Sequence, residues 1–460
     1  MPDRISKRLV FLLGAVFAAE FTLACIYGLR VGGADEYFLR SALFFAVNVL
    51  ITMLVLRVLP QVINLERLPV LSVAVVLKIA FSILVLFTYL LAHNSFFLNV
   101  TGDDHEYYHL AKMYSGDFSR FVYEESDNYA FPYASVALIV ESYLGNVQII
   151  RLLQLLSSCF TCVLFYRVLG NLGFESKIRN ATILLFILAP APTFYSMFIY
   201  KDTLVMLCIS AFLVGFTDKR AGALAYGLMG AALLVGSYFR GFLAPVFVFL
   251  LLVNTWLARS DQQKTLARAI RASLLTAAVF VIFIFFFSGL VERTTLIFDL
   301  MEIRLTAKQE EFGGAVNLSL PRLLLTSVFA FNVVPPVFSD FATNWSNSEG
   351  FLAFSRSYNF AISIFMFAGI FWPVERNRKW LIFILSLSML VLGMAFVGQT
   401  LSDRHKLMMY PFVYILVAFG IQRLNALKTF NYNVVTFIAA SILLLVQYGY
   451  MELRLGQYGL

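Results

Sequence analysis

Residues 407–421 read Leu-Met-Met-Tyr-Pro-Phe-Val-Tyr-Ile-Leu-Val-Ala-Phe-Gly-Ile, a run without a single charged side chain. A helix that crosses the hydrocarbon core of a bilayer needs about 20 predominantly apolar residues, so this run predicts a membrane span. Runs of the same kind recur along the chain and bring the number of candidates to about 13. The others lie at 9–29, 41–63, 70–92, 147–169, 180–199, 203–217, 223–239, 242–257, 273–290, 358–373, 380–397 and 434–449.

The overall composition indicates the same class of protein. The 460 residues are 60% apolar and 13% charged, with a mean hydropathy of +0.81. Soluble domains are about 45–50% apolar and about 25% charged. We therefore expect an all-α fold, a polytopic membrane helical bundle with a small extracytoplasmic cap. Its expected parts are N-terminal spans in 1–92, a first outer loop in 93–146, central spans in 147–290, a second outer loop in 291–357 and C-terminal spans in 358–460.

The positive charge of the chain follows its expected topology. The net charge is +8. With the N-terminus in the cytoplasm, Lys and Arg dominate the cytoplasmic segments and Asp and Glu dominate the opposite side, as the positive-inside rule requires. The basic loop at 259–271 and the turn at 376–379 fix this orientation. We expect a multi-pass protein of a bacterial inner membrane with its site facing the periplasm, and no nucleic-acid partner.

The first outer loop contains an unusual polar segment. Residues 101–109 read Thr-Gly-Asp-Asp-His-Glu-Tyr-Tyr-His, which places three carboxylates and two imidazoles beside the membrane. Ionisable groups there are costly unless they do chemistry or bind a charged partner. We expect a helix from His105 to Tyr114 and a second short helix from Phe131 to Tyr143 that lies along the membrane.

Charged residues from four separate stretches fall at outer helix ends or in outer loops. They are Asp103, Asp104, Lys201, Asp202, Arg240, Asp403, Arg404, His405 and Lys406. Cations can hold a phosphate, and Arg does so with two parallel hydrogen bonds. A carboxylate can take the proton of an attacking hydroxyl. The sequence therefore predicts a site for a phosphate-bearing substrate and a hydroxyl nucleophile.

Taken in order, four segments resemble the GT-C superfamily of integral membrane glycosyltransferases, which includes protein O-mannosyltransferases and lipid A aminoarabinose transferases. The first is Gly-Asp-Asp-His-Glu-Tyr-Tyr-His-Leu-Ala at 102–111. The second runs from Phe-Pro-Tyr-Ala-Ser at 131–135 to the Arg-Leu-Leu of 151–153. The third joins Ala-Pro-Ala-Pro-Thr-Phe-Tyr-Ser to Lys-Asp-Thr-Leu, and the fourth is Asp-Arg-His-Lys-Leu-Met-Met-Tyr-Pro-Phe at 403–412.

This resemblance implies a glycosyltransferase that takes a sugar from a polyprenyl-phosphate donor. The acceptor would be a hydroxyl of a glycan, a lipid or a protein, in the assembly of cell-surface polysaccharide or glycolipid. Asp103 or Asp104 would be the catalytic base, and either remains open at this point. Residues expected to bind the substrates, with the cations on the phosphate, are Glu106, His109, Lys201, Asp202, Arg240, Arg404 and His405.

Three other readings remain open. The Lys-Asp and Tyr-Phe-Arg-Gly segments also look like membrane polymerases of O-antigen or capsule polysaccharides, in which donor and acceptor are both lipid-linked. His105, Glu106 and His109 form H-E-x-x-H, the pattern of a zinc metallopeptidase. A lipid or glycan flippase is the third, but it would need polar residues along its helices. No cofactor is identified, because the acidic loop accommodates a divalent metal without requiring one.

Topology can be tested by cysteine labelling. We expect an impermeant thiol reagent added to the outer face to modify Ser126→Cys and Ser346→Cys and to spare Gln262→Cys, because charge asymmetry places the 93–146 and 291–357 loops outside. Labelling of Gln262→Cys alone would invert the orientation.

Overall fold

The computed structural model describes residues 71–73, 75–80, 82–83, 103–126, 130–218, 222–241, 243–258, 349–374, 378–396 and 405–426. Every regular element in these ranges is a helix, as the composition predicts. The first helices are α4 (Asp103–Met113), α5 (Phe118–Glu125), α6 (Phe131–Leu144), η2 (Val147–Ile149), α7 (Ile150–Asn171), α8 (Ser176–Ile187) and α9 (Pro190–Tyr195). The others are α10 (Asp202–Thr217), α11 (Ala223–Phe239), α12 (Leu243–Ala258), α17 (Glu349–Phe371), α18 (Arg378–Phe396), η3 (His405–Met409) and α19 (Tyr410–Ala426).

Two stretches in this part of the chain are long and apolar enough to cross a membrane, namely Ile150–Asn171 and Lys406–Ala426. Both coincide with predicted spans. The predicted runs at 203–217, 223–239 and 242–257 are also single helices, α10, α11 and α12. The predicted spans at 9–29, 41–63, 273–290 and 434–449 lie outside the described residues.

One prediction about the spans is wrong. The run at 180–199 is two helices, because Pro190 and Pro192 follow α8 and proline cannot donate the backbone hydrogen bonds that would continue it. Helix α17 begins at Glu349, within the predicted second outer loop at 291–357, whose residues before 349 lie outside the described part of the chain. The predicted helices of the first outer loop are confirmed as α4 and α6, each within two residues of its expected bounds.

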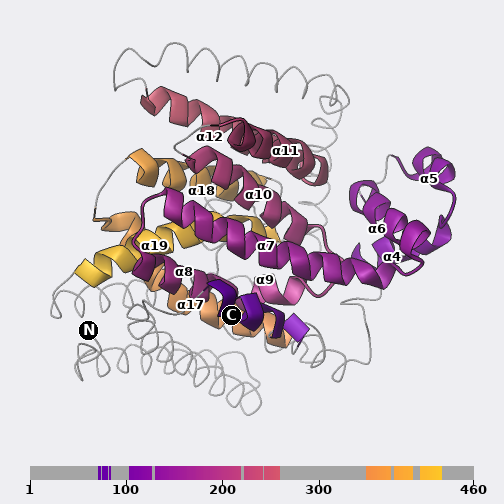
Figure 1. The fold of residues 1–460 in the computed structure, drawn as a ribbon, viewed down its shortest axis with the longest axis horizontal. Helices are drawn as coiled ribbons and strands as arrows, with labels where there is room; N and C mark the ends of the chain where they lie inside the picture. The colour runs from indigo at the N-terminus through magenta and orange to yellow at the C-terminus, as the bar shows by residue number, and fades with distance from the viewer. Residues whose placement is uncertain are drawn as a thin grey trace, which may run out of the picture.

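The described helices form a bundle with a smaller group of helices at one end (Figure 1). Within the bundle α10 packs against both α7 and α11, and α19 packs against α17, α8 and α18. Helices α4, α5 and α6 lie together beyond the start of α7 (Figure 1). A buried Glu141 secures this group, since its carboxylate accepts from Lys112 at 2.5 Å and from the backbone N–H of Val147 at 2.6 Å.

Helices α17 and α19 approach each other through glycine. A Cβ added to Gly369 of α17 would overlap the carbonyl oxygen of Leu416, and one added to Gly420 of α19 would overlap the carbonyl oxygen of Phe365. Small residues at a crossing let two backbones touch, which is how helices associate in an apolar solvent where hydrophobic burial gives little. The close approach of α17 and α19 is therefore possible because neither Gly369 nor Gly420 carries a side chain.

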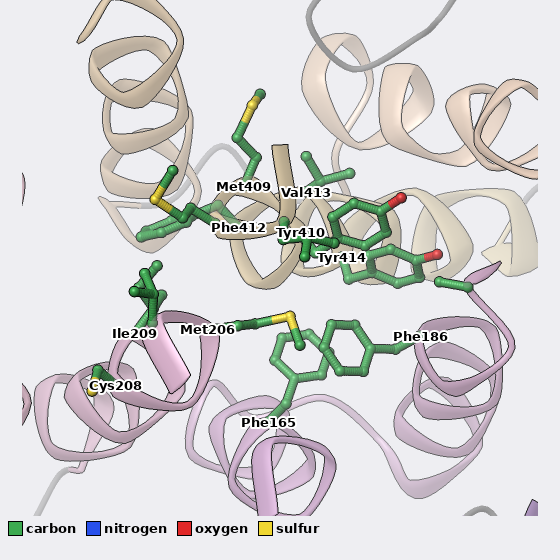
Figure 2. Packing of buried hydrophobic residues seen from close by; sticks show 14 of the residues in the cluster. Phe165, Phe186, Met206, Cys208, Ile209, Met409, Tyr410, Phe412, Val413 and Tyr414 are labelled. Atoms are coloured by element: carbon green, nitrogen blue, oxygen red, sulfur yellow. The ribbon is translucent and has the colours of Figure 1, made fainter. Parts of the chain in front are cut away.

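Aromatic rings fill the space between α19 and the earlier helices. Phe165 of α7 stacks on Phe186 of α8 at a centroid distance of 4.6 Å. The Phe186 ring meets Tyr414 of α19 edge to face at 5.2 Å. Figure 2 shows these rings pointing toward one another, with Met206 of α10 beside them. Edge-to-face pairs add roughly 0.5–1.5 kcal/mol to the area they bury.

Polar side chains compensate the break between α8 and α9. The backbone N–H of Ala189 donates to Phe186 rather than to Leu185. The carbonyl of Leu185 instead accepts from the hydroxyls of Tyr358 at 2.6 Å and Tyr414 at 3.3 Å. A carbonyl left unsatisfied in an apolar interior would cost several kcal/mol. These tyrosines therefore tie α17 and α19 to the end of α8.

Adding a methyl group at the glycine crossing should destabilise the bundle. We expect Gly420→Ala to cost about 1–3 kcal/mol, because the new Cβ must push two backbones apart. Thermal unfolding in detergent measures the effect. Gly230→Ala in α11 is the matched control, since nothing lies within 4 Å of its Cβ position. A loss of stability in Gly420→Ala no larger than in the control would contradict the contact.

Candidate functional site

The two adjacent aspartates of the outer loop begin α4 and have different surroundings. Asp103 is partly exposed, and its Oδ2 accepts from the Tyr107 hydroxyl at 3.4 Å. Asp104 is fully buried, and its Oδ1 accepts from the backbone N–H of His105 at 3.0 Å. Both carboxylates lie in the first turn of α4, where the helix dipole attracts negative charge.

A buried cation compensates the buried Asp104. Arg151, the second residue of α7, is 8% exposed and interacts electrostatically with the Asp104 carboxylate. A buried carboxylate is strongly disfavoured without a partner, and the Arg151 guanidinium offsets part of that cost for Asp104. Sequence reasoning quoted Arg151 within the family resemblance but gave it no role.

The Lys201–Asp202 and Arg240 segments meet, as the topology predicts. Asp202 is the first residue of α10 and Arg240 directly follows α11, so the antiparallel pair brings both to the same end. An Nη of Arg240 donates to Oδ1 of Asp202 at 2.6 Å, with side chains 9% and 0% exposed. The Nε of Arg240 is also buried and has no hydrogen-bond partner in the described part of the chain. This guanidinium therefore keeps a donor available for a ligand.

Two further buried cations belong to the same end of the bundle. Lys201 immediately precedes α10 and is 7% exposed, and Lys406 in η3 is 5% exposed. The η3 segment packs against α10. It includes the backbone of His405, whereas Arg404 and Asp403 lie outside the described residues. The fourth predicted stretch therefore reaches the others through Lys406.

A tyrosine that sequence reasoning missed lies between these groups. Tyr133 of α6 is fully buried, and its hydroxyl accepts from Nε2 of Gln154. Burial, with the nearby Asp202 carboxylate, raises the pKa of Tyr133 well above its ordinary value, so the phenol stays protonated. No spacing rule marks Tyr133, but a glutamine inside the apolar run at 147–169 was a usable signal for its partner Gln154.

The H-E-x-x-H residues do not form a zinc site with other described residues. The rings of His105 and His109 are parallel at a centroid distance of 6.3 Å. Glu124 and Glu125, acidic residues at the end of α5, both accept from the Tyr114 hydroxyl, at 2.7 Å and 3.0 Å. Among the described residues no group of three His, Cys, Asp or Glu side chains is arranged to hold a metal ion. Glu106 is partly exposed and His109 is exposed on α4.

Comparison with protein-family models, with curated proteins and with solved structures finds no match to this chain. The chemistry of the site therefore has to be read from its own residues.

The Asp202–Arg240 pair should be important for stability. We expect Asp202→Asn to lower the free energy of unfolding by about 3–5 kcal/mol, because it leaves a buried guanidinium uncompensated. Unfolding in mixed micelles measures this. Glu124→Gln is the control, since its pair with Arg120 is exposed on both sides and should be worth about 1 kcal/mol or less. Equal losses in the two variants would contradict the burial of the pair.

Proposed function

We propose that this protein is a membrane glycosyltransferase. It would move a sugar from a polyprenyl-phosphate donor to an acceptor hydroxyl on the extracytoplasmic face. The observation that carries the proposal is the gathering of buried charge where helix ends meet. The buried carboxylates of Asp104 and Asp202 begin helices, Asp202 pairs with Arg240, and the other buried cations are Arg151, Lys201 and, on the η3 segment that packs against α10, Lys406. Burying that much charge is expensive and marks a functional site.

The proposed reaction needs few groups. The acceptor oxygen attacks the anomeric carbon, and the bond from that carbon to the donor phosphate oxygen breaks. The acceptor proton passes to a carboxylate, and polyprenyl phosphate leaves with the bonding electrons. A carboxylate suffices as general base, and fixed cations stabilise the negative charge that develops on the leaving phosphate. No metal is needed for this balance.

Asp103 is the better candidate for the base. Its carboxylate is partly exposed, so an acceptor can reach it. Asp104 is fully buried and has no exposed surface to offer an acceptor. In this assignment Asp104 and Arg151 orient the start of α4, and Asp103 takes the proton.

The phosphate would bind near the start of α10. The unsatisfied Nε of Arg240 gives a charge-assisted donor there. Lys201 immediately precedes Asp202, the residue that pairs with Arg240. Arg404 and His405 would complete the site from the η3 side, a role that stays a prediction. The helix dipole of α10 adds a favourable field for an anion.

A panel of lipid-linked sugars tests the function. Purified protein in lipid nanodiscs is incubated with radiolabelled polyprenyl-phosphate hexoses, pentoses and amino sugars, together with lipid-linked oligosaccharide or lipid acceptors. We expect one donor to yield free polyprenyl phosphate and a larger glycan or glycolipid. Growth of long chains from lipid-linked repeat units would identify a polymerase. No donor turnover, together with chelator-sensitive cleavage of peptides, would replace the proposal by the metallopeptidase.

The base assignment predicts a ranking of three isosteric variants. We expect Asp103→Asn to lower kcat by about 10²–10⁴-fold, since it removes the general base and keeps the shape. Glu106→Gln should be the mild control on the same helix. Asp104→Asn should lose stability as well as activity because Arg151 loses its partner. Steady-state turnover and thermal unfolding of each variant separate these effects. Near-normal kcat in Asp103→Asn would remove it as the base.

A further inference from the structure

Tyr133 contacts two helices that carry predicted site residues. Its ring meets Tyr107 of α4 edge to face at 4.9 Å, and Tyr107 donates its own hydroxyl to Asp103. On another side it meets Phe239 edge to face at 6.0 Å. Phe239 is the last residue of α11 and is followed by Arg240. The Tyr133 ring therefore lies between Tyr107, which bonds to the predicted base Asp103, and Phe239, which precedes Arg240 of the buried ion pair.

The hydroxyl of Tyr133 connects a third and a fourth segment. Gln154 of α7 directs its Nε2 to this hydroxyl and, at 2.7 Å, to the backbone carbonyl of Tyr200. An amide nitrogen has two hydrogens, so both are used. Tyr200 lies just before Lys201 and Asp202, and the Asp202 carboxylate acts electrostatically on Tyr133. Removing one hydroxyl would thus disturb the segment that leads into α10.

Packing alone does not require these polar groups. Gln154 and Tyr133 are buried at 1% and 0% exposure, where Leu and Phe would fill similar space without desolvating polar atoms. The Oε1 of Gln154 is buried without a hydrogen-bond partner among the described residues, so the two bonds from Nε2 are the ones that connect these segments. A hydrogen bond from the amide to the phenol fixes α6 relative to α7, and the amide's second bond fixes the start of α10 relative to both.

We propose that Tyr133 is a positioning residue that holds Asp103 and the Asp202–Arg240 pair in one arrangement. The effect of Tyr133 on catalysis rests on the proposed glycosyl transfer. Its effect on the order of the chain around Asp202 and Arg240 is independent of that proposal. Tyr133 touches no reacting atom in this proposal and acts through Tyr107, Gln154 and Phe239.

The test compares three variants of the full-length protein in nanodiscs. Tyr133→Phe removes the hydroxyl and keeps the ring contacts, and Gln154→Leu removes the amide. Tyr114→Phe is the matched control, because Tyr114 is also a buried tyrosine of the outer helices but bonds to Glu124 and Glu125. Hydrogen exchange is measured by mass spectrometry in peptides that contain Asp202 or Arg240. Donor kinetics are measured on the polyprenyl-phosphate sugar that the wild-type protein uses.

We expect faster exchange in both peptides for Tyr133→Phe and Gln154→Leu, and no change for Tyr114→Phe. The kcat of Tyr133→Phe should fall about 10-fold to 100-fold with the donor KM unchanged, since misplaced groups slow the chemical step. The double variant should be no slower than the worse single variant, because both remove one network.

Two results overturn the inference. One is exchange near Asp202 and Arg240 no faster than in Tyr114→Phe. The other is unchanged kcat in Tyr133→Phe when the wild-type protein turns over a donor. If exchange rises but the wild type uses no lipid-linked sugar, the ordering role of Tyr133 is supported and the glycosyltransferase proposal fails.

Discussion

The backbone contact at Gly369 and Gly420 is the constraint on which the rest of the bundle depends. Because the backbones of α17 and α19 touch at these two glycines, the two helices pack together as one structural element. The tyrosines of that element then reach the Leu185 carbonyl, which fixes the end of α8. The same element continues into η3, which packs against α10 and carries the buried Lys406.

A second constraint acts at that end, where charge is buried in pairs. The Asp202–Arg240 pair joins the start of one helix to the end of the next. Asp104 near the start of α4 and Arg151 near the start of α7 also interact electrostatically. Each pair is costly to desolvate, and neither partner tolerates loss of the other. Such pairs contribute little to net stability compared with apolar packing, so their presence is better explained by what they hold in place.

The apolar runs predicted the positions of several helices. The reason is that a helix in such a run ends near the charged residues that flank it. Asp202 and Arg240 bound such runs, so their adjacency followed from two antiparallel helices. Pro190 indicated a break after α8, but the long apolar run at 180–199 led to the prediction of a single span. Tyr133 could not be found, because its importance comes from a hydrogen bond to Gln154, 21 positions away, and from rings on two other helices.

Lys78 has a consequence for how the chain is made. It is 1% exposed within a predicted span, and its Nζ donates to Oγ1 of Thr193 at 2.6 Å. A lysine at the centre of a single inserting helix costs roughly 2.5–3.5 kcal/mol. Its partner is 115 positions further along and leaves the ribosome only later. In the multi-pass arrangement that we propose, the early helix would enter the membrane before the Thr193 hydroxyl is available, so the contact between Lys78 and Thr193 would form only after the later helix has inserted.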